Sequence, residues 1–421
     1  MTELHLPTPP SVSNPVMGHV KPRIPVQNPV GGPSRYDAEV ASLPDLPKPQ
    51  LAKPFQTVMP NNGRRAVNAF GVRNEYGEIG PLQISRRALL PTDVEVDIHY
   101  CGLCHSDIHQ AYNEWKSAIY PQVEGHEIVG IVLNVGPLVT EFKVGDKVAV
   151  GTMVNSCRVC KSCESGNEQY CTNGGPSWTY NSHERFPGEL LPMGEMTAGG
   201  YSDMIVVNKD FVFKLPDNLT FDQMASISPL LCAGVTVFTP LMQDRVGPGR
   251  RVGVAGIGGL GHLAIKMIKA LGATAVVITR SPWKMKDASR LGADYAILAS
   301  DDSQMKKAQG TLDLILCTIP SPHDMCNYLN LLALGGKMWN LGVEEPHQPP
   351  NMKLLNRMNR SICASEVGGL AATRAMLQFC MDKNITADVE IVKFDKAREH
   401  FDRVRAADVR YRFVFDVKGN H

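Results

Sequence analysis

The stretch "VGVAGIGGLGHLAIKMIKALGATAVVIT", residues 252–279, predicts the main part of the fold. A strand-like apolar run leads into Gly256, Gly258 and Gly261, a helical pattern follows, and a second strand-like run ends at Thr279. Glycines at this spacing allow a tight turn, close approach of the backbone to a pyrophosphate, and close packing of helix on strand. The start of a helix also favours negative charge. The stretch therefore predicts a strand–helix–strand unit that binds a dinucleotide.

The same alternation extends beyond this unit and begins after about Leu230. Several of the short apolar runs are separated by helical patterns, and the runs are "RVGVAG", "TAVVIT", "DYAILAS", "LDLILC", "GKMWNLG" and "SICAS". Strands that alternate with helices are typical of a parallel sheet with crossover helices. The sequence therefore predicts a Rossmann domain over residues 234–363.

A different pattern precedes this domain. The runs "DVEVDIHYCG", "GHEIVGIVLNVG" and "VGDKVAV" are rich in β-branched residues and separated by Gly and Asp, which is typical of antiparallel strands in a barrel-like domain. The last segment, from "ADVEIVKFD" to "RYRFVFDVKGN", returns to this pattern. Residues 65–233 and 364–421 are therefore predicted to form a second domain. Prolines gather before it, so residues 1–64 are predicted to be a disordered or surface-draped extension.

Length and charge limit the class of protein. At 421 residues the chain exceeds what one hydrophobic core usually organises, which agrees with two domains. The 43 Lys and Arg residues against 42 Asp and Glu give a net charge of +1, so no global field draws the protein to nucleic acid or anionic lipid. We see no apolar run of roughly 18 residues and no secretory signal pattern. We therefore expect a cytoplasmic protein with no nucleic-acid or membrane partner.

Four of the eleven cysteines lie in one short loop, "CRVCKSCESGNEQYC". The spacing of Cys157, Cys160, Cys163 and Cys171 lets the chain wrap one ion with four thiolates. Clustering and an odd total favour metal binding over disulfides. Iron and sulfur also accept four thiolates, but the usual bacterial run spaces its last cysteine differently, and a nucleic-acid zinc module would carry a basic helix where this loop has "ESGNE". The loop predicts a structural zinc site.

A second metal set is possible among residues that lie far apart in the chain. A catalytic zinc takes three protein ligands and keeps one open position. The candidates are Cys104 in "YCGLCHSDIH", His126 and Glu127 in "EGHEIVG", and Cys232 in "SPLLCAGVTVF". Taken singly each is weak, because a histidine in a glycine-flanked turn is usually structural and a single apolar-flanked cysteine usually belongs to the core.

The motifs "CGLCHSDIH", "GHEIVG", the four-cysteine loop, "PLLCAGVTVF" and "GIGGLGHLAIK", in this order, resemble the zinc-containing medium-chain alcohol dehydrogenases, particularly the cinnamyl-alcohol-dehydrogenase-like branch. The resemblance covers approximately residues 66–418. It implies an α/β protein with a GroES-like β-barrel catalytic domain and a doubly wound Rossmann domain. It also implies that Cys104, His126 and Cys232 ligate a catalytic zinc, which Glu127 approaches transiently.

The same resemblance gives roles to the rest of the stretch around Cys104. Ser106 matches the hydroxyl that touches the substrate oxygen, and His109 matches the imidazole that completes a proton path to solvent. Asp107 suits a carboxylate that orients a histidine ligand, and His105 suits a contact to the pyrophosphate; ordinary local hydrogen bonding is the alternative for both. Trp115 either lines an apolar substrate pocket or belongs to the core.

The residues after the second strand predict which cofactor is used. An NAD site usually has Asp or Glu about 20 residues beyond the glycines, to accept from the ribose 2′-hydroxyl. This chain has Thr279, Arg280 and Ser281 there, with Lys284 close by, so no carboxylate repels a 2′-phosphate and several groups can bind it. NADP(H) is therefore expected. The full predicted cofactor set is His105, Thr236, Gly256, Gly258, Gly259, Leu260, Gly261, Thr279, Arg280, Ser281 and Lys284.

Together these features predict an NADP(H)-dependent zinc alcohol dehydrogenase, or aldehyde reductase, with two zinc ions per chain, a small aldehyde or alcohol as substrate, and a homodimeric assembly. Members of the same fold that oxidise polyols or reduce an iminium or alkene are the nearest alternative. A non-catalytic, zinc-stabilised nucleotide sensor is a distant one, since a sensor needs neither an open metal site nor a proton path. One departure from the related pattern is Glu124, where the branch often has proline; it either adds negative charge near the site or faces water. The physiological substrate and direction stay open.

Overall fold

The structure is a computed structural model that describes residues 63–342 and 350–419. Every described residue belongs to one unit of the chain, which spans residues 55–421. The predicted proline-rich extension lies outside the described residues except for Gly63 and Arg64.

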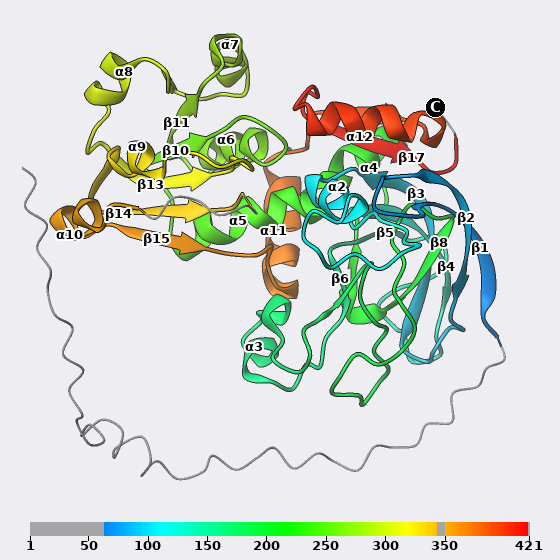
Figure 1. The fold of residues 1–421 in the computed structure, drawn as a ribbon. Helices are drawn as coiled ribbons and strands as arrows, with labels where there is room; N and C mark the ends of the chain where they lie inside the picture. Colours follow the sequence, from blue (N-terminus) through cyan, green and yellow to red (C-terminus); the bar gives the residue numbers. More distant parts are fainter. Residues whose placement is uncertain (1–62, 343–349, 420–421) are drawn as a thin grey trace, which may run out of the picture. The chain divides into compact units, whose positions relative to one another are not determined.

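One domain, called here the barrel domain, is built on a sheet in the order β16–β17–β3–β4–β5–β9, with β8 also paired to β3 (Figure 1). Its central strand β3 is buried along almost its whole length because neighbouring strands and apolar side chains cover it. Val414 of β17 pairs with Gly102 of β3, so the C-terminal segment lies in the same sheet as β3 and β4, whereas β1 and β2 form a separate two-stranded sheet. The strands are β1 (Arg65–Val72), β2 (Ile79–Arg86), β3 (Asp93–Gly102), β4 (Ile128–Val135), β5 (Lys147–Val150), β6 (Met153–Asn155), β7 (Ser177–Trp178), β8 (Met204–Asn208), β9 (Val212–Lys214), β16 (Val389–Val392) and β17 (Arg412–Asp416).

The other domain, called here the Rossmann domain, holds a parallel sheet in the order β12–β11–β10–β13–β14–β15. This order runs outward in both directions from the adjacent strands β10 and β13, which confirms the predicted doubly wound fold. Ligands of such sheets bind at the carboxyl ends of the strands where the order reverses. The strands are β10 (Arg251–Ala255), β11 (Thr274–Thr279), β12 (Tyr295–Leu298), β13 (Leu312–Cys317), β14 (Leu332–Asn340) and β15 (Ser361–Ala364).

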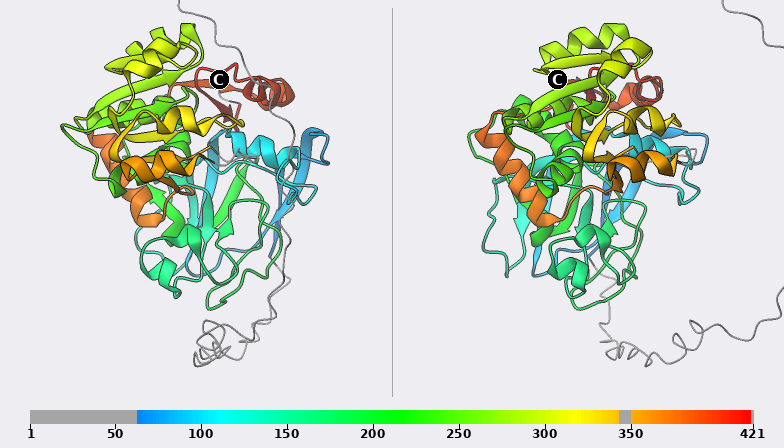
Figure 2. Two further views of the ribbon diagram at one scale, coloured as in Figure 1. Left: turned by 60° about the vertical axis from the view of Figure 1, so that its left-hand side comes forward. Right: turned by 90° about the vertical axis from the view of Figure 1, so that its left-hand side faces the viewer.

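The central strands β10, β11 and β13 are buried on both faces, which explains why they are mostly apolar. Along β11, Ala275 and Val277 join the large core that continues into the barrel domain, whereas Val276 and Ile278 join a separate core on the opposite face. Helices lie along the sheet in both views of Figure 2. The helices are α2 (His105–Ala111), α3 (Lys161–Glu164), α4 (Phe221–Ile227), α5 (Ala233–Gln243), α6 (Gly261–Ala270), α7 (Pro282–Arg290), α8 (Asp302–Lys307), α9 (Met325–Leu329), α10 (Met352–Met358), α11 (Leu370–Asp382) and α12 (Ala397–Arg405), with short 3₁₀ turns η1 (Glu168–Tyr170), η2 (Lys209–Phe211), η3 (Ser228–Leu231) and η4 (Phe394–Lys396).

The apolar helix pair before the Rossmann domain is bent at Cys232. Thr220 begins α4 with a side-chain cap that accepts from the backbone N–H of Gln223, and α5 is buried along most of its length. No single helix in the described part of the chain is long and apolar enough to cross a bilayer; the bent pair Phe221–Leu231 and Ala233–Gln243 passes that test of length and composition only when joined. The bend leaves the Cys232 thiol at the start of α5.

The domain boundaries predicted at 233/234 and 363/364 stay predictions.

Candidate active site

The second metal set comes together from three junctions between regular elements of the chain. Cys104 stands between β3 and α2, His126 and Glu127 immediately precede β4, and Cys232 precedes α5. All four residues are buried, and their potential ligand atoms lie within 4.8 Å of one another. Because each residue ends or begins a regular element of the packed core, the backbone fixes where its side chain lies.

The donor atoms of this set fit a zinc ion. The Sγ atoms of Cys104 and Cys232 are 3.8 Å apart. Two thiolates on a tetrahedral zinc with Zn–S bonds of about 2.3 Å would be separated by about 3.8 Å. The Nδ1 atom of His126 is engaged by Asp107, which leaves Nε2 as the metal-binding nitrogen. Oε2 of Glu127 is buried and has no hydrogen-bond partner among the described residues.

Asp107 lies behind this set and is fully buried. Its Oδ1 contacts Nδ1 of His126 at 3.0 Å and accepts from the backbone N–H of Gly125 at 3.2 Å. Its Oδ2 accepts from the N–H of Cys104 at 2.8 Å and from the hydroxyl of Tyr201 at 3.0 Å. Burial lowers the pKa of His126, but the Asp107 carboxylate and the Cys104 thiol together raise it by more, so the pKa lies well above its ordinary value. These contacts support the orienting role predicted for Asp107.

Arg412 is a charged neighbour of the set that sequence reasoning missed. Its guanidinium forms a fully buried ion pair with Glu127. Burial raises the pKa of Glu127 to about 8, and Arg412 opposes that rise. Arg412 also packs on the glycine-rich loop, since a Cβ at Gly259 would lie 2.7 Å from its Cδ. No local pattern marks Arg412, because it reaches Glu127 from β17, 285 residues further along the chain.

A cleft of ≈ 1110 Å³ is lined by both domains. The site residues predicted from the sequence that line it are Cys104, His105, Ser106, His109, Trp115, His126, Cys232, Thr236, Gly256, Gly258, Gly259, Leu260, Thr279, Arg280, Ser281 and Lys284. Asp107, Glu127 and Gly261 do not line it. Gly261 lies under the loop, where a Cβ would come within 2.1 Å of the carbonyl oxygen of Gly256, so only glycine lets α6 begin there.

The glycine-rich loop fits a pyrophosphate. Gly256 has a φ of +94°, which side chains rarely adopt. A Cβ at Gly258 would meet nothing within 4 Å, so the backbone there borders open space beside the start of α6. At the end of β11, Arg280 is exposed, and the Nζ of Lys284 donates to the carbonyl of Ile257 at 3.0 Å. This corner of the cleft is therefore cationic, as a 2′-phosphate requires.

The predicted proton-path residues lie on one helix. The hydroxyl of Ser106 is 3.7 Å from Sγ of Cys104, and His109 follows one turn later on α2. Nδ1 of His109 lies 2.5 Å from Oε2 of Glu114, a partner that sequence reasoning missed although it is only five residues away. Trp115 stacks on His109 with ring centroids 4.9 Å apart, is 37% exposed and lines the cleft, so it does not belong to the core.

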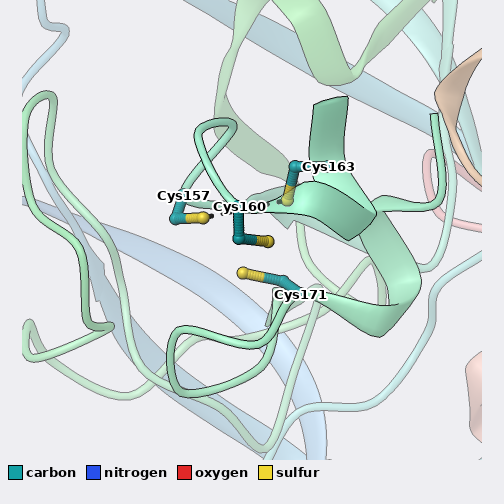
Figure 3. Close-up of side chains that lie close together, drawn as sticks. All are labelled: Cys157, Cys160, Cys163 and Cys171. Atoms are coloured by element: carbon teal, nitrogen blue, oxygen red, sulfur yellow. Dashed lines mark hydrogen bonds between the residues drawn. The ribbon is translucent and has the colours of Figure 1, made fainter. Parts of the chain in front are cut away.

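The four-cysteine loop forms a second site with a different environment. Figure 3 shows the side chains of the four cysteines pointing toward one another, and their Sγ atoms lie within 4.8 Å of one another. The Cys157 and Cys163 sulfurs are 3.9 Å apart, close to the separation of about 3.8 Å expected on a tetrahedral zinc. Burial raises the pKa of Cys160, but hydrogen bonds from the backbone N–H groups of Cys163 and Thr172 outweigh that effect. The net result is a pKa lowered to about 5. The donor set fits a zinc ion held entirely by sulfur.

Arg185 is a buried cation beside this loop and was also missed. It donates to the carbonyl oxygens of Asn173 and Gly175, at 3.0 and 2.7 Å, just after Cys171. Burial lowers the pKa of Arg185, and the nearby thiols oppose that change. A positive charge in this position balances thiolate charge.

Glu124 does not face water. It is fully buried, and neither carboxylate oxygen has a hydrogen-bond partner among the described residues. Burial and the neighbouring Asp107 raise its pKa well above the ordinary value, which favours the uncharged form.

Comparison with known proteins agrees with this geometry. Residues 90–217 match the family model "Alcohol dehydrogenase GroES-like domain", and residues 259–382 match "Zinc-binding dehydrogenase". An NADP-dependent alcohol dehydrogenase C of Mycolicibacterium smegmatis is 44% identical over 83% of this chain and 98% of its own. Among solved structures, a cinnamyl alcohol dehydrogenase from Sorghum bicolor has a TM-score of 0.80 and 40% identity, covering 85% of this chain and 99% of its own. One from Helicobacter pylori in complex with NADP(H) has a TM-score of 0.78 and 35% identity, covering 85% of this chain and 100% of its own. The chain therefore belongs to the zinc-containing medium-chain alcohol dehydrogenases, in their cinnamyl-alcohol-dehydrogenase-like branch.

Proposed function

We propose that the protein catalyses reversible hydride transfer between NADP(H) and a primary alcohol/aldehyde pair, and that it reduces aldehydes. The observation that carries this proposal is the juxtaposition, in one cleft, of the buried two-cysteine, one-histidine donor set and the glycine-rich loop with a cationic corner. A structural protein would need only a metal site, and a nucleotide sensor would need only the glycine-rich loop. The relatives named above support the same reaction class.

The protein's own contribution begins with its metal ligands. Cys104, His126 and Cys232 would hold the catalytic zinc, and Asp107 keeps the His126 ring in one tautomer and orientation. When bound, zinc supplies a Lewis acid for the carbonyl oxygen and NADPH supplies the hydride. Glu127 forms a buried ion pair with Arg412 beside the metal ligands. Arg412 also packs on Gly259, so it connects the metal set with the glycine-rich loop.

Proton transfer falls to α2. The Ser106 hydroxyl lies beside Cys104 and lines the cleft, where it can donate to the substrate oxygen. His109 restores that proton, because Glu114 engages its Nδ1 and leaves Nε2 for proton exchange. Selection of the phosphorylated cofactor falls to Arg280, Ser281 and Lys284 at the end of β11.

Assembly as a homodimer and a cytoplasmic location are also proposed. The dimer follows from the family resemblance. A reducing compartment is supported by the eleven cysteines, none of which forms a disulfide; six of them belong to the two metal sets and three more, Cys101, Cys317 and Cys380, are buried in the core. Light scattering on the purified protein and fractionation of cells test the two statements.

The reaction is tested by following NADPH oxidation with a panel of aldehydes, in parallel with NADH, and by identifying the product. A primary alcohol is the expected product. Reduction of a carbon–carbon double bond, or no oxidation of NADPH with any aldehyde, would overturn the proposal. Ser106→Ala should lower kcat far more than it weakens NADPH binding, since the hydroxyl acts on the substrate oxygen; a variant with unchanged kcat would remove Ser106 from the proton path.

A further inference from the structure

One charged residue in the cleft is not used by the chemistry above. Glu366 lines the cleft and is the only carboxylic acid among its lining residues in the described part of the chain. The cationic residues that line the same cleft are Arg280, Lys284, Arg405 and Arg412. A lone carboxylate in a cleft that otherwise carries positive charge is a feature that a substrate can recognise.

The strand order places Glu366 far from the 2′-phosphate corner. Glu366 follows β15, the last strand of the parallel sheet, whereas Thr279 ends β11, four strands away. At about 4.8 Å per strand, the two strand ends are separated by about 19 Å. The crossover between β10 and β13, where the glycine-rich loop lies, stands between them. Glu366 therefore belongs to the half of the cleft away from the adenosine end of the cofactor.

The barrel domain fixes the backbone of Glu366. Its N–H donates to the hydroxyl of Tyr170 at 2.9 Å, and four residues later the N–H of Leu370 donates to Oε2 of Glu168 at 2.9 Å. Glu168 and Tyr170 both lie on η1 of the four-cysteine loop. Tyr170 and Trp178 line the same cleft as Glu366, and the Tyr170 hydroxyl touches the Glu366 backbone, so the wall that carries this carboxylate also carries aromatic rings.

The carboxylate of Glu366 is unpaired among the described residues. It accepts no hydrogen bond and joins no ion pair among the described residues, and it is accessible from the cleft. The surrounding protein nevertheless raises the pKa of Glu366 above its ordinary value by burial. A cation that enters the cleft would compensate this charge, and aromatic faces nearby attract the same kind of group.

We propose that Glu366 selects aldehydes that carry a cationic nitrogen, an ammonium or quaternary ammonium group, at the end remote from the reacting carbonyl. The inference rests on the proposed function and names the substrate class of the same site. Tyr170 and Trp178 flank the cation, and Glu366 supplies the opposite charge.

The experiment compares two isosteric aldehydes with the zinc-loaded full chain and NADPH. The probes are para-(trimethylammoniomethyl)benzaldehyde and its neutral counterpart para-neopentylbenzaldehyde. We expect wild-type kcat/KM to favour the cation by about tenfold, which corresponds to about 1.4 kcal/mol. Glu366→Gln, which keeps the shape and removes the charge, should abolish that preference while leaving kcat/KM for the neutral aldehyde within about twofold. Glu399→Gln, at an exposed carboxylate of α12 outside the cleft lining, is the matched control and should keep the preference.

Binding gives a readout independent of turnover. Tryptophan fluorescence should report benzyltrimethylammonium binding to the NADP⁺ complex, with Kd raised about tenfold by Glu366→Gln and unchanged by Glu399→Gln. If wild type reduces both aldehydes equally well and Glu366→Gln leaves Kd unchanged, the inference is wrong while the proposed function stands. If neither aldehyde is reduced, the proposed function is wrong, whatever the binding measurement shows for Glu366.

Discussion

Asp107→Asn is the substitution that most directly tests how the catalytic metal set is held. The change keeps the size of the side chain and removes its charge. Asp107 is fully buried and each of its oxygens contacts two groups: Gly125 and His126 at Oδ1, Cys104 and Tyr201 at Oδ2. An asparagine offers one acceptor oxygen and one NH₂ donor. In either orientation the NH₂ group therefore faces a backbone N–H that has lost its acceptor.

The magnitude follows from these contacts. A buried N–H without an acceptor costs about 1–3 kcal/mol, and replacing a charged acceptor by a neutral one on the His126 bond costs about 1 kcal/mol more. We expect the free energy of unfolding to fall by about 2–4 kcal/mol. Because the histidine ligand is then oriented less firmly, zinc affinity at the catalytic site should fall by about 10- to 100-fold.

Two assays measure these quantities: urea unfolding of the zinc-loaded protein and competition for zinc with a chromophoric chelator. Asp97→Asn is the control, since Asp97 is partly exposed and pairs with Lys418 at 2.7 Å and His99 at 3.1 Å. Partly exposed pairs of this kind contribute about 0–1 kcal/mol. An Asp107→Asn protein with the stability and zinc affinity of the control would refute the reasoning that this carboxylate positions the ligand.

Three further changes test other parts of the molecule. Thr279→Asp combined with Arg280→Ala should shift the ratio of kcat/KM for NADPH over NADH toward NADH by at least about tenfold, since one charge-assisted contact contributes about 1.5–3 kcal/mol; equal use of both cofactors by wild type would contradict the assignment. Cys163→Ser should lose one zinc and much of its stability, whereas Cys232→Ser should stay folded, lose the other zinc and be inactive; metal analysis and unfolding curves distinguish the two. Burial lowers the pKa of His262 from 6.5 to about 3. As pH falls below 6.5, the His262 imidazole is therefore protonated in the unfolded chain before it is protonated in the folded protein, and the free energy of unfolding decreases. Between about pH 6.5 and pH 4 the loss should be about 3 kcal/mol, and His262→Gln should flatten that part of the urea-midpoint profile.

The sites that could be predicted from the sequence are those whose geometry is contained in one short segment. The loop from Gly256 to Gly261 and the loop from Cys157 to Cys171 each carry their own turns and spacings, so residue type and order suffice to predict a pyrophosphate cradle and a four-sulfur site. The Rossmann domain was predictable for a similar reason, because its central strands β10, β11 and β13 are buried on both faces and are therefore mostly apolar.

Contacts between distant segments could not be predicted in this way. Arg412 reaches Glu127 only because β17 pairs with β3, and Glu366 meets Tyr170 across 196 residues. Both pairings depend on strand register and domain packing, which no local spacing encodes. Glu124 illustrates the limit for a single residue. The sequence does not decide whether its side chain faces water or lies in the interior, and only the packed structure shows that it is buried.

The anchoring of the four-cysteine loop on the start of α11 has a consequence for how the protein would respond to oxidants. Thiolates are the groups that peroxides attack, and their oxidation releases zinc. Glu168 and Tyr170 would then lose the support that holds residues 366–370 in the cleft wall. The ligands of the catalytic metal belong to other segments, so loss of zinc from the four-cysteine loop alone should impair substrate discrimination before hydride transfer, and a thiol reductant with added zinc should restore it.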